Sequence, residues 1–145
     1  MNDRRLSSAI DRLPAAGLVL AISLAACGGN GPSPSPTLAP RPASPATVQI
    51  VQPAQGASVT GDTLHIVLKL TGATIVEQTT TAIRPDEGHV HLYVNNVLVS
   101  MNYGLEQDIP IQPGSIDLKA EFVAADHAPF DPRVWSSDVI FTVKP

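Results

Sequence analysis

Three of the four histidines lie in two short segments of the chain, and imidazole is the side chain that most often ligates transition metals. His89 and His91 are two residues apart, so on a β-strand both side chains project from the same face. His127 follows in a second segment, Asp126-His127-Ala128-Pro129. Neutral imidazole suits Zn²⁺ or Cu²⁺, and the thioether of Met101 would suit Cu(I). We therefore treat His89, His91 and His127 as a candidate copper or zinc site, and expect no other cofactor.

A plainer interpretation of the same residues stays open. In it, His89 and His91 are outward-facing strand residues without a ligand, and His127 hydrogen-bonds within its own loop. Met101 then contributes packing only. The fourth histidine, His65, falls in a different run of the sequence, and we predict that it lies on the surface.

The elements that must position these side chains are short runs of alternating apolar residues separated by turn signals. Asn95-Asn96 predicts a two-residue hairpin turn, and Pro113-Gly114 predicts a second turn. No segment has a sustained helical period. This pattern predicts an all-β, Ig-like β-sandwich of about seven strands over residues 47–145, with a cupredoxin-like barrel as the alternative. The predicted strands cover residues 48–51, 64–70, 75–76, 90–94, 97–99, 109–111, 116–122 and 134–143.

In such a sandwich the histidine strand pairs antiparallel with the strand at 116–124, which brings its start close to His127. Val90, Leu92 and Val94 take the core face, so His89 and His91 fall on the outer face or near the mouth of the strand. Three imidazoles then converge at one end of the sandwich. Ring-orienting acceptors would complete a metal site, and the candidates are Asp126, Glu87 and Glu121. The strand at 64–70 places Leu64, Ile66, Leu68 and Leu70 on its interior face.

The N-terminus predicts export. Residues 1–12 hold three arginines, and residues 13–26 are mostly apolar and too short to span a bilayer comfortably. The run ends in Leu24-Ala25-Ala26-Cys27, which resembles the bacterial lipobox. The resemblance implies a signal peptide at 1–26 and a lipidated Cys27, carrying acyl chains such as palmitate. The chain would then be a lipoprotein on the extracytoplasmic face of the cell membrane or the outer membrane. An ordinary signal peptide with an incidental cysteine, or a transmembrane anchor, is the alternative.

Residues 27–46 form a composition break between this leader and the strands. Proline fixes φ and removes a backbone donor, so the segment predicts an extended, partly stiff linker. Its prolines are Pro32, Pro34, Pro36, Pro40, Pro42 and Pro45.

Charge and motif content argue against several functions. The formal net charge is −4, and no run of Lys or Arg offers a phosphate-binding patch, so we expect no nucleic-acid partner. The chain contains no nucleophile elbow and no phosphate loop, so we expect no enzyme. A single cysteine excludes an internal disulfide.

The two histidine segments are similar to those of an uncharacterised family of small exported bacterial domains. The family shows a Gly-His-His-His-Leu-like strand, a Pro-Gly turn, and an Ala-Asp-His…Pro…Pro segment before the last strand. Here the order is the same over Glu87 to Val143: Gly88-His89-Val90-His91-Leu92, Pro113-Gly114, and Asp126-His127 followed by Pro129 and Pro132. Val90 and Phe130 stand where the family pattern has histidine, which would weaken an inherited metal site.

The leading functional hypothesis is a membrane-anchored, non-enzymatic Ig-like domain that binds or positions something outside the cytoplasm. Its partner would be an unknown protein, glycan or metal ligand. The alternative is a periplasmic or extracellular transition-metal binding protein, with copper as the metal.

Overall fold

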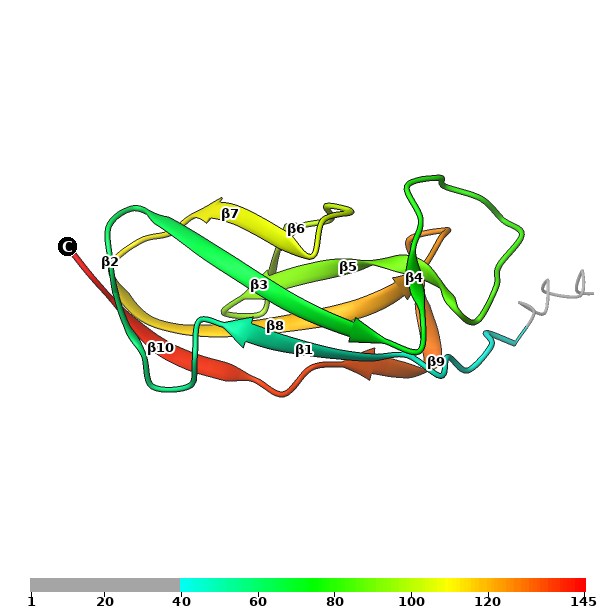
Figure 1. Cartoon of the computed structure of the whole chain (residues 1–145), viewed down its shortest axis with the longest axis horizontal. Helices are drawn as coiled ribbons and strands as arrows, with labels where there is room; N and C mark the ends of the chain where they lie inside the picture. The colour runs from blue at the N-terminus through cyan, green and yellow to red at the C-terminus, as the bar shows by residue number, and fades with distance from the viewer. Residues whose placement is uncertain (1–39) are drawn as a thin grey trace, which may run out of the picture. The chain divides into compact units, whose positions relative to one another are not determined.

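The computed structural model describes residues 40–145, which fold into ten β-strands without a helix (Figure 1). The predicted signal peptide, Cys27 and most of the predicted linker lie outside the described residues. No helix in the described part of the chain is long and apolar enough to cross a membrane. The strands are β1 (Thr47–Gln52), β2 (Ser58–Thr60), β3 (Thr63–Thr71), β4 (Thr74–Ile75), β5 (Glu87–Val94), β6 (Val97–Ser100), β7 (Glu106–Pro110), β8 (Gly114–Ala124), β9 (Pro129–Trp135) and β10 (Val139–Lys144).

The strands form two sheets, and their order confirms the predicted Ig-like β-sandwich. One sheet has the order β1-β3-β7, with antiparallel neighbours. The other has the order β2-β10-β8-β5-β4, and β6 and β9 pair with β5 and β8 beside this path. The seven principal strands therefore divide as β1, β3 and β7 against β5, β6, β8 and β10, which is an Ig-like arrangement. The short strands β2, β4 and β9 extend the second sheet.

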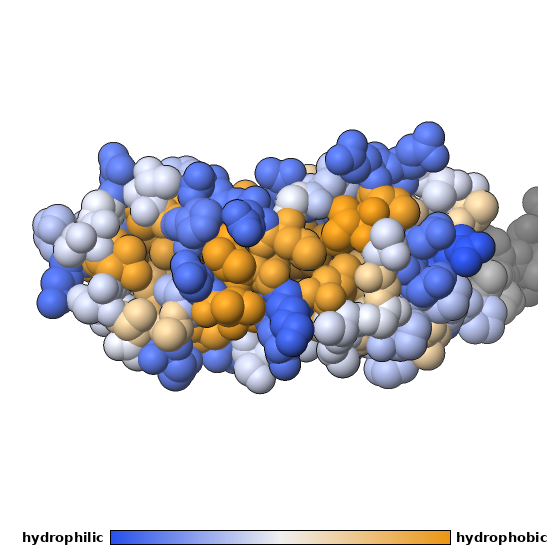
Figure 2. Space-filling model, viewed as in Figure 1, coloured by the Kyte–Doolittle hydropathy of each residue, from blue (hydrophilic) through white to orange (hydrophobic). Residues whose placement is uncertain are grey.

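The core lies between the two sheets and follows the alternation of the sequence. In β3, Leu64, Ile66 and Leu68 are buried and Leu70 is partly buried, which confirms the predicted interior face. They pack in one cluster with Val90 and Leu92 of β5 and with the apolar side chains of β8 and β10. Apolar side chains also reach the surface around the middle of the face in Figure 2, where polar residues border them. The core is a single apolar layer between the sheets. Because Val90 and Leu92 face this layer, the histidines of β5 must lie on the opposite face of the strand.

The end of the chain differs from the prediction of one strand over 134–143. The structure has two strands there, β9 and β10, and both pair with β8. Ser136 lies in the break between them: its backbone N–H donates to the Ala120 carbonyl at 2.8 Å, and its hydroxyl accepts from the Ala120 N–H at 2.9 Å. The Ser136 hydroxyl therefore accepts a hydrogen bond from β8 that a backbone carbonyl would accept in a continuous strand. β9 also begins at Pro129, five residues before the start of the predicted strand at 134–143.

Candidate metal centre

His89 and His91 lie on the face of β5 that points away from the core, as the strand period predicts. They are nevertheless buried, with exposed fractions of 1% and 5%, which their predicted place on the outer face did not indicate. Two loops supply the cover. The ring of Tyr103, between β6 and β7, meets His89 edge-on at 5.2 Å between centroids. Thr79, between β4 and β5, contacts His127. The outer face of this sheet is therefore closed locally by segments distant in the sequence.

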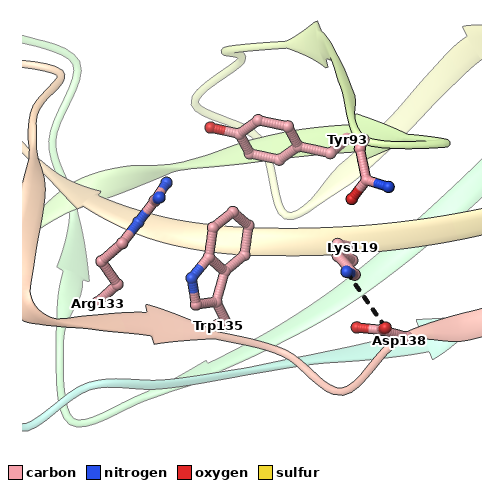
Figure 3. Close-up of a pocket in the computed structure, with 6 residues that line it drawn as sticks. Tyr93, Lys119, Arg133, Trp135 and Asp138 are labelled. Carbon is pink, nitrogen blue, oxygen red and sulfur yellow. Dashed lines mark ion pairs between the residues drawn. The ribbon is translucent and has the colours of Figure 1, made fainter.

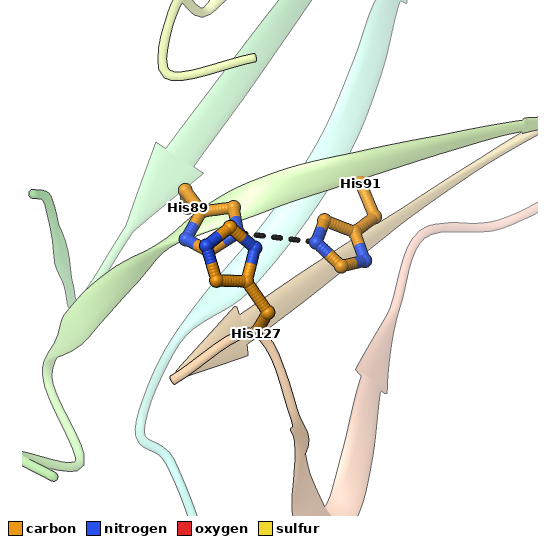
Figure 4. Close-up of side chains that lie close together, drawn as sticks. All are labelled: His89, His91 and His127. Atoms are coloured by element: carbon orange, nitrogen blue, oxygen red, sulfur yellow. Dashed lines mark hydrogen bonds between the residues drawn. The ribbon is translucent and has the colours of Figure 1, made fainter. Parts of the chain in front are cut away.

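The structure brings the three predicted histidines together (Figure 4). His89 Nε2 lies 3.1 Å from His91 Nε2 and 2.9 Å from His127 Nδ1. One nitrogen from each of the three rings lies within 4.8 Å of the other two. Three imidazoles therefore direct nitrogens at one small volume, as the ligands of a metal ion do.

Strand pairing sets this geometry. In the β5–β8 ladder His89 is opposite Val123 and His91 is opposite Glu121, and β8 ends at Ala124. The chain then turns back tightly, with the His127 N–H donating to the Ala124 carbonyl at 2.9 Å. His127 has a φ of 64°, and its ring lies against His89 near the start of β5. At the start of β5, a Cβ on Gly88 would overlap the Val123 carbonyl oxygen, so glycine allows the two strands to approach here.

An ion pair from the predicted linker holds the loop of His127. The guanidinium of Arg41 donates to both carboxylate oxygens of Asp126, at 2.6 and 2.9 Å, and to the carbonyls of Ala128 and Pro129. These hydrogen bonds from Arg41 hold the pKa of the Asp126 carboxyl below its usual range. The last residues of the predicted linker therefore pack on the domain beside the candidate site.

The predicted ring-orienting acceptors are engaged elsewhere, so that expectation is wrong. Asp126 binds Arg41, and Glu87 binds Arg84 at 3.0 Å. Glu121, only 1% exposed, accepts from Arg133 at 2.7 Å and from the Tyr93 hydroxyl at 3.1 Å. None of these carboxylates hydrogen-bonds an imidazole within residues 40–145. The polar partner of His127 is instead the Thr79 hydroxyl, 3.1 Å from His127 Nε2, which was not predicted from the sequence.

Burial keeps the strand histidines neutral. It lowers the pKa of His89 to about 4, and the neighbouring His127 and His91 act in the same direction. Burial also lowers the pKa of His91, against the opposing effect of the Glu121 carboxylate. Both rings therefore carry free lone pairs at neutral pH. The remaining nitrogen of His89, Nδ1, is buried and has no hydrogen-bond partner among the described residues.

The other two residues considered from the sequence lie apart from this cluster. Met101 follows β6 and is 52% exposed, so its thioether is a surface group rather than a buried ligand. His65 is on β3, where its ring bonds Asp108 at 2.8 Å across the pair with β7. Its exposed position confirms the prediction that it is a surface residue.

Comparisons with known proteins add little beyond the fold. No protein-family model and no curated protein matches the chain. A solved structure of the Clostridium thermocellum CbhA fibronectin(III)-like modules is similar over 68% of this chain, with 22% sequence identity and a TM-score of 0.45. The matched region spans 46% of that chain. A likeness of this size carries no argument about function, and the Ig-like assignment rests on the strand order itself.

Proposed function

We propose that the domain binds a transition-metal ion, copper or zinc, through His89, His91 and His127. The observation that carries this proposal is the convergence of three imidazole nitrogens, with two of the separations at 2.9 and 3.1 Å. Zn–N bonds of about 2.0–2.1 Å in a tetrahedron place ligand nitrogens about 3.3–3.4 Å apart. The two separations at His89 Nε2 therefore need only a small expansion to accept an ion.

The hydrogen-bond inventory of the cluster also favours a cation. Each neutral imidazole carries one N–H and one lone pair. His89 Nε2 faces two other ring nitrogens, and one proton on it can satisfy only one of them. A cation at the centre would accept all three lone pairs and place the N–H of His127 on Nε2, where the Thr79 hydroxyl lies.

The donor set narrows the choice of metal. Three imidazoles without a buried thioether suit divalent Cu²⁺ or Zn²⁺ rather than Cu(I), and Cu²⁺ binds such nitrogen sites more tightly than Zn²⁺ does. Combined with the predicted lipobox at Cys27, the proposal describes a lipid-anchored, non-enzymatic metal-binding domain outside the cytoplasm.

Metal titration of the purified full-length chain tests the proposal. We expect one Zn²⁺ or Cu²⁺ per chain, and an increase in unfolding free energy of about 2.7 kcal/mol when free metal is 100 times Kd. His127→Asn is the informative variant, because asparagine tolerates the positive φ at this position and removes the ligand. His65→Asn is the matched control, since it removes an exposed histidine outside the cluster. Equal metal affinity in His127→Asn and the unmodified chain would refute the site.

A further inference from the structure

A hollow lies beside the candidate metal centre, on the outer face of the sheet that contains β5 and β8. It has a volume of about 580 Å³ and is lined by Tyr93, Asn96, Lys119, Arg133, Trp135 and Asp138 (Figure 3). Its residues come from β5, the β5–β6 turn, β8, β9 and the break before β10. Tyr93 is two residues beyond His91 on the same face of β5, so the hollow follows the candidate metal centre along that strand.

Two aromatic rings form the apolar part of this hollow. The centroids of Tyr93 and Trp135 are 5.2 Å apart, with the rings tilted by 60°. The guanidinium of Arg133 lies over Trp135, 4.4 Å from the ring centroid. Figure 3 shows Arg133 on one side of Trp135 and the Lys119–Asp138 pair on the other. Trp135 is still 38% exposed, so it offers an aromatic surface to a ligand.

The polar part supplies donors and acceptors without surplus charge. Lys119 and Asp138 form an ion pair at 3.2 Å, and the amide of Asn96 can both donate and accept. The charge of Arg133 is balanced by its two hydrogen bonds to Glu121. A ligand with a net charge would therefore meet no complementary excess. A wholly apolar ligand would strip water from Lys119 and Asp138 without replacing its hydrogen bonds.

The rings are held in place before any ligand arrives. The buried Glu121 carboxylate accepts from the Tyr93 hydroxyl and from Arg133, which in turn lies over Trp135. Side chains fixed in this way lose little conformational entropy when a ligand binds. The aromatic part of the hollow is thus preorganised for a ligand.

From these features we infer that the hollow binds a neutral saccharide. The C–H face of a pyranose ring would pack on Trp135, because those hydrogens complement the negative face of an aromatic ring. The ring hydroxyls would exchange hydrogen bonds with Lys119, Asp138 and Asn96. The volume lies within the range of about 300–1,000 Å³ of small-molecule sites, which accommodates one or two sugar units. This inference is independent of metal binding.

Trp135 is the only tryptophan of the chain, so its fluorescence reports on the hollow alone. The full-length chain is titrated with soluble neutral oligosaccharides of glucose, xylose, mannose and N-acetylglucosamine, up to about 10 mM. We expect a saturable change in emission with at least one of them. Titration calorimetry should show Trp135→Ala weakening binding by about tenfold or more. Asn96→Gly should also weaken it, and glycine preserves the backbone there because Asn96 has a φ of 65°. The control Val51→Ala, an exposed apolar residue of the other sheet, should bind as the unmodified chain does.

Two comparisons make the result decisive. His127→Asn should bind the saccharide as the unmodified chain does, whether or not it has lost metal. If Asn96→Gly and Trp135→Ala, both still folded by circular dichroism, bind every responding sugar normally, the hollow is not the site and the inference is wrong. Absence of any emission change across the whole panel, or a response only to a charged polymer such as polyphosphate, overturns it as well.

Discussion

Acid should destabilise the metal-free domain through His89. The folded state holds the pKa of this imidazole at about 4, because burial and the neighbouring His127 and His91 penalise its charged form. In the unfolded chain the pKa returns to about 6.5. A pKa difference of about 2.5 corresponds to a limit of about 3.4 kcal/mol, reached only well below pH 4. Between about pH 8 and pH 5 the same linkage gives a loss of about 2 kcal/mol.

The direction of this effect follows from which state binds the proton. A group whose pKa is lower in the folded state stabilises the fold fully above its unfolded pKa, here about 6.5. That stability is lost as pH falls from about 6.5 towards 4, since only the unfolded chain takes up the proton readily. His91 acts in the same direction because burial also lowers its pKa. Asp126 has its pKa lowered from 3.8, so its contribution changes below this window.

Urea unfolding at about pH 8, 7, 6 and 5, with chelator present, measures the effect. We compare the unmodified chain with His89→Asn, which cannot titrate, and with His65→Asn, which removes an exposed histidine. The unmodified chain and His65→Asn should lose about 2 kcal/mol more between pH 8 and pH 5 than His89→Asn does. Parallel pH profiles for all three proteins would show that His89 is not held neutral by the fold, and would refute the reasoning.

Three further predictions concern the loop, the core and the anchor. Arg41→Ala should weaken zinc binding by about tenfold by calorimetry, because it frees the loop that carries His127, whereas the surface variant Arg84→Ala should not; equal weakening would contradict this. Leu68→Ala should lower the free energy of urea unfolding by about 2–4 kcal/mol, through lost burial and a cavity, and a change below about 0.5 kcal/mol would mean that the residue is not in the core. Cys27→Ser should abolish acyl labelling and release the protein from the membrane fraction, and unchanged labelling would contradict the lipobox.

Local alternation was enough to predict most of the fold. The period of two in residues 64–70 and 90–94 placed the core faces correctly, because a sandwich buries one face of each strand. The antiparallel pairing of the histidine strand with the 116–124 strand also followed from an Ig-like order. The break at Ser136 was missed, although Ser136-Ser137-Asp138 interrupts the apolar residues of 134–143 with a polar cluster that favours a turn or loop.

The three histidines of the candidate metal centre could be predicted from the sequence, but their burial and their hydrogen-bond partners could not. Strand pairing brings His127 near His89 and His91, which required only the topology. Tyr103, which packs against His89, and Thr79, which contacts His127, reach the site from loops whose paths no local pattern determines. The predicted carboxylate partners were wrong because each carboxylate pairs with an arginine instead of an imidazole: Asp126 with Arg41, Glu87 with Arg84, and Glu121 with Arg133.

Glu121 connects the two candidate sites on this outer face. It is opposite His91 in the ladder, where its charge opposes the lowering of that ring's pKa by burial, and it binds Arg133 and Tyr93 beside the hollow lined by Trp135. Only the carboxylate of this ion pair is buried, since the Arg133 side chain is 49% exposed, and the cost of desolvating that carboxylate offsets much of the attraction between the charges. Glu121 instead positions its neighbours. It fixes Tyr93 and Arg133, which both contact Trp135, and it places a negative charge, balanced by Arg133, next to the histidines. A sheet face that would otherwise be open to solvent thereby gains two ordered polar sites, which is consistent with a domain whose outer face, rather than its core or edges, recognises ligands.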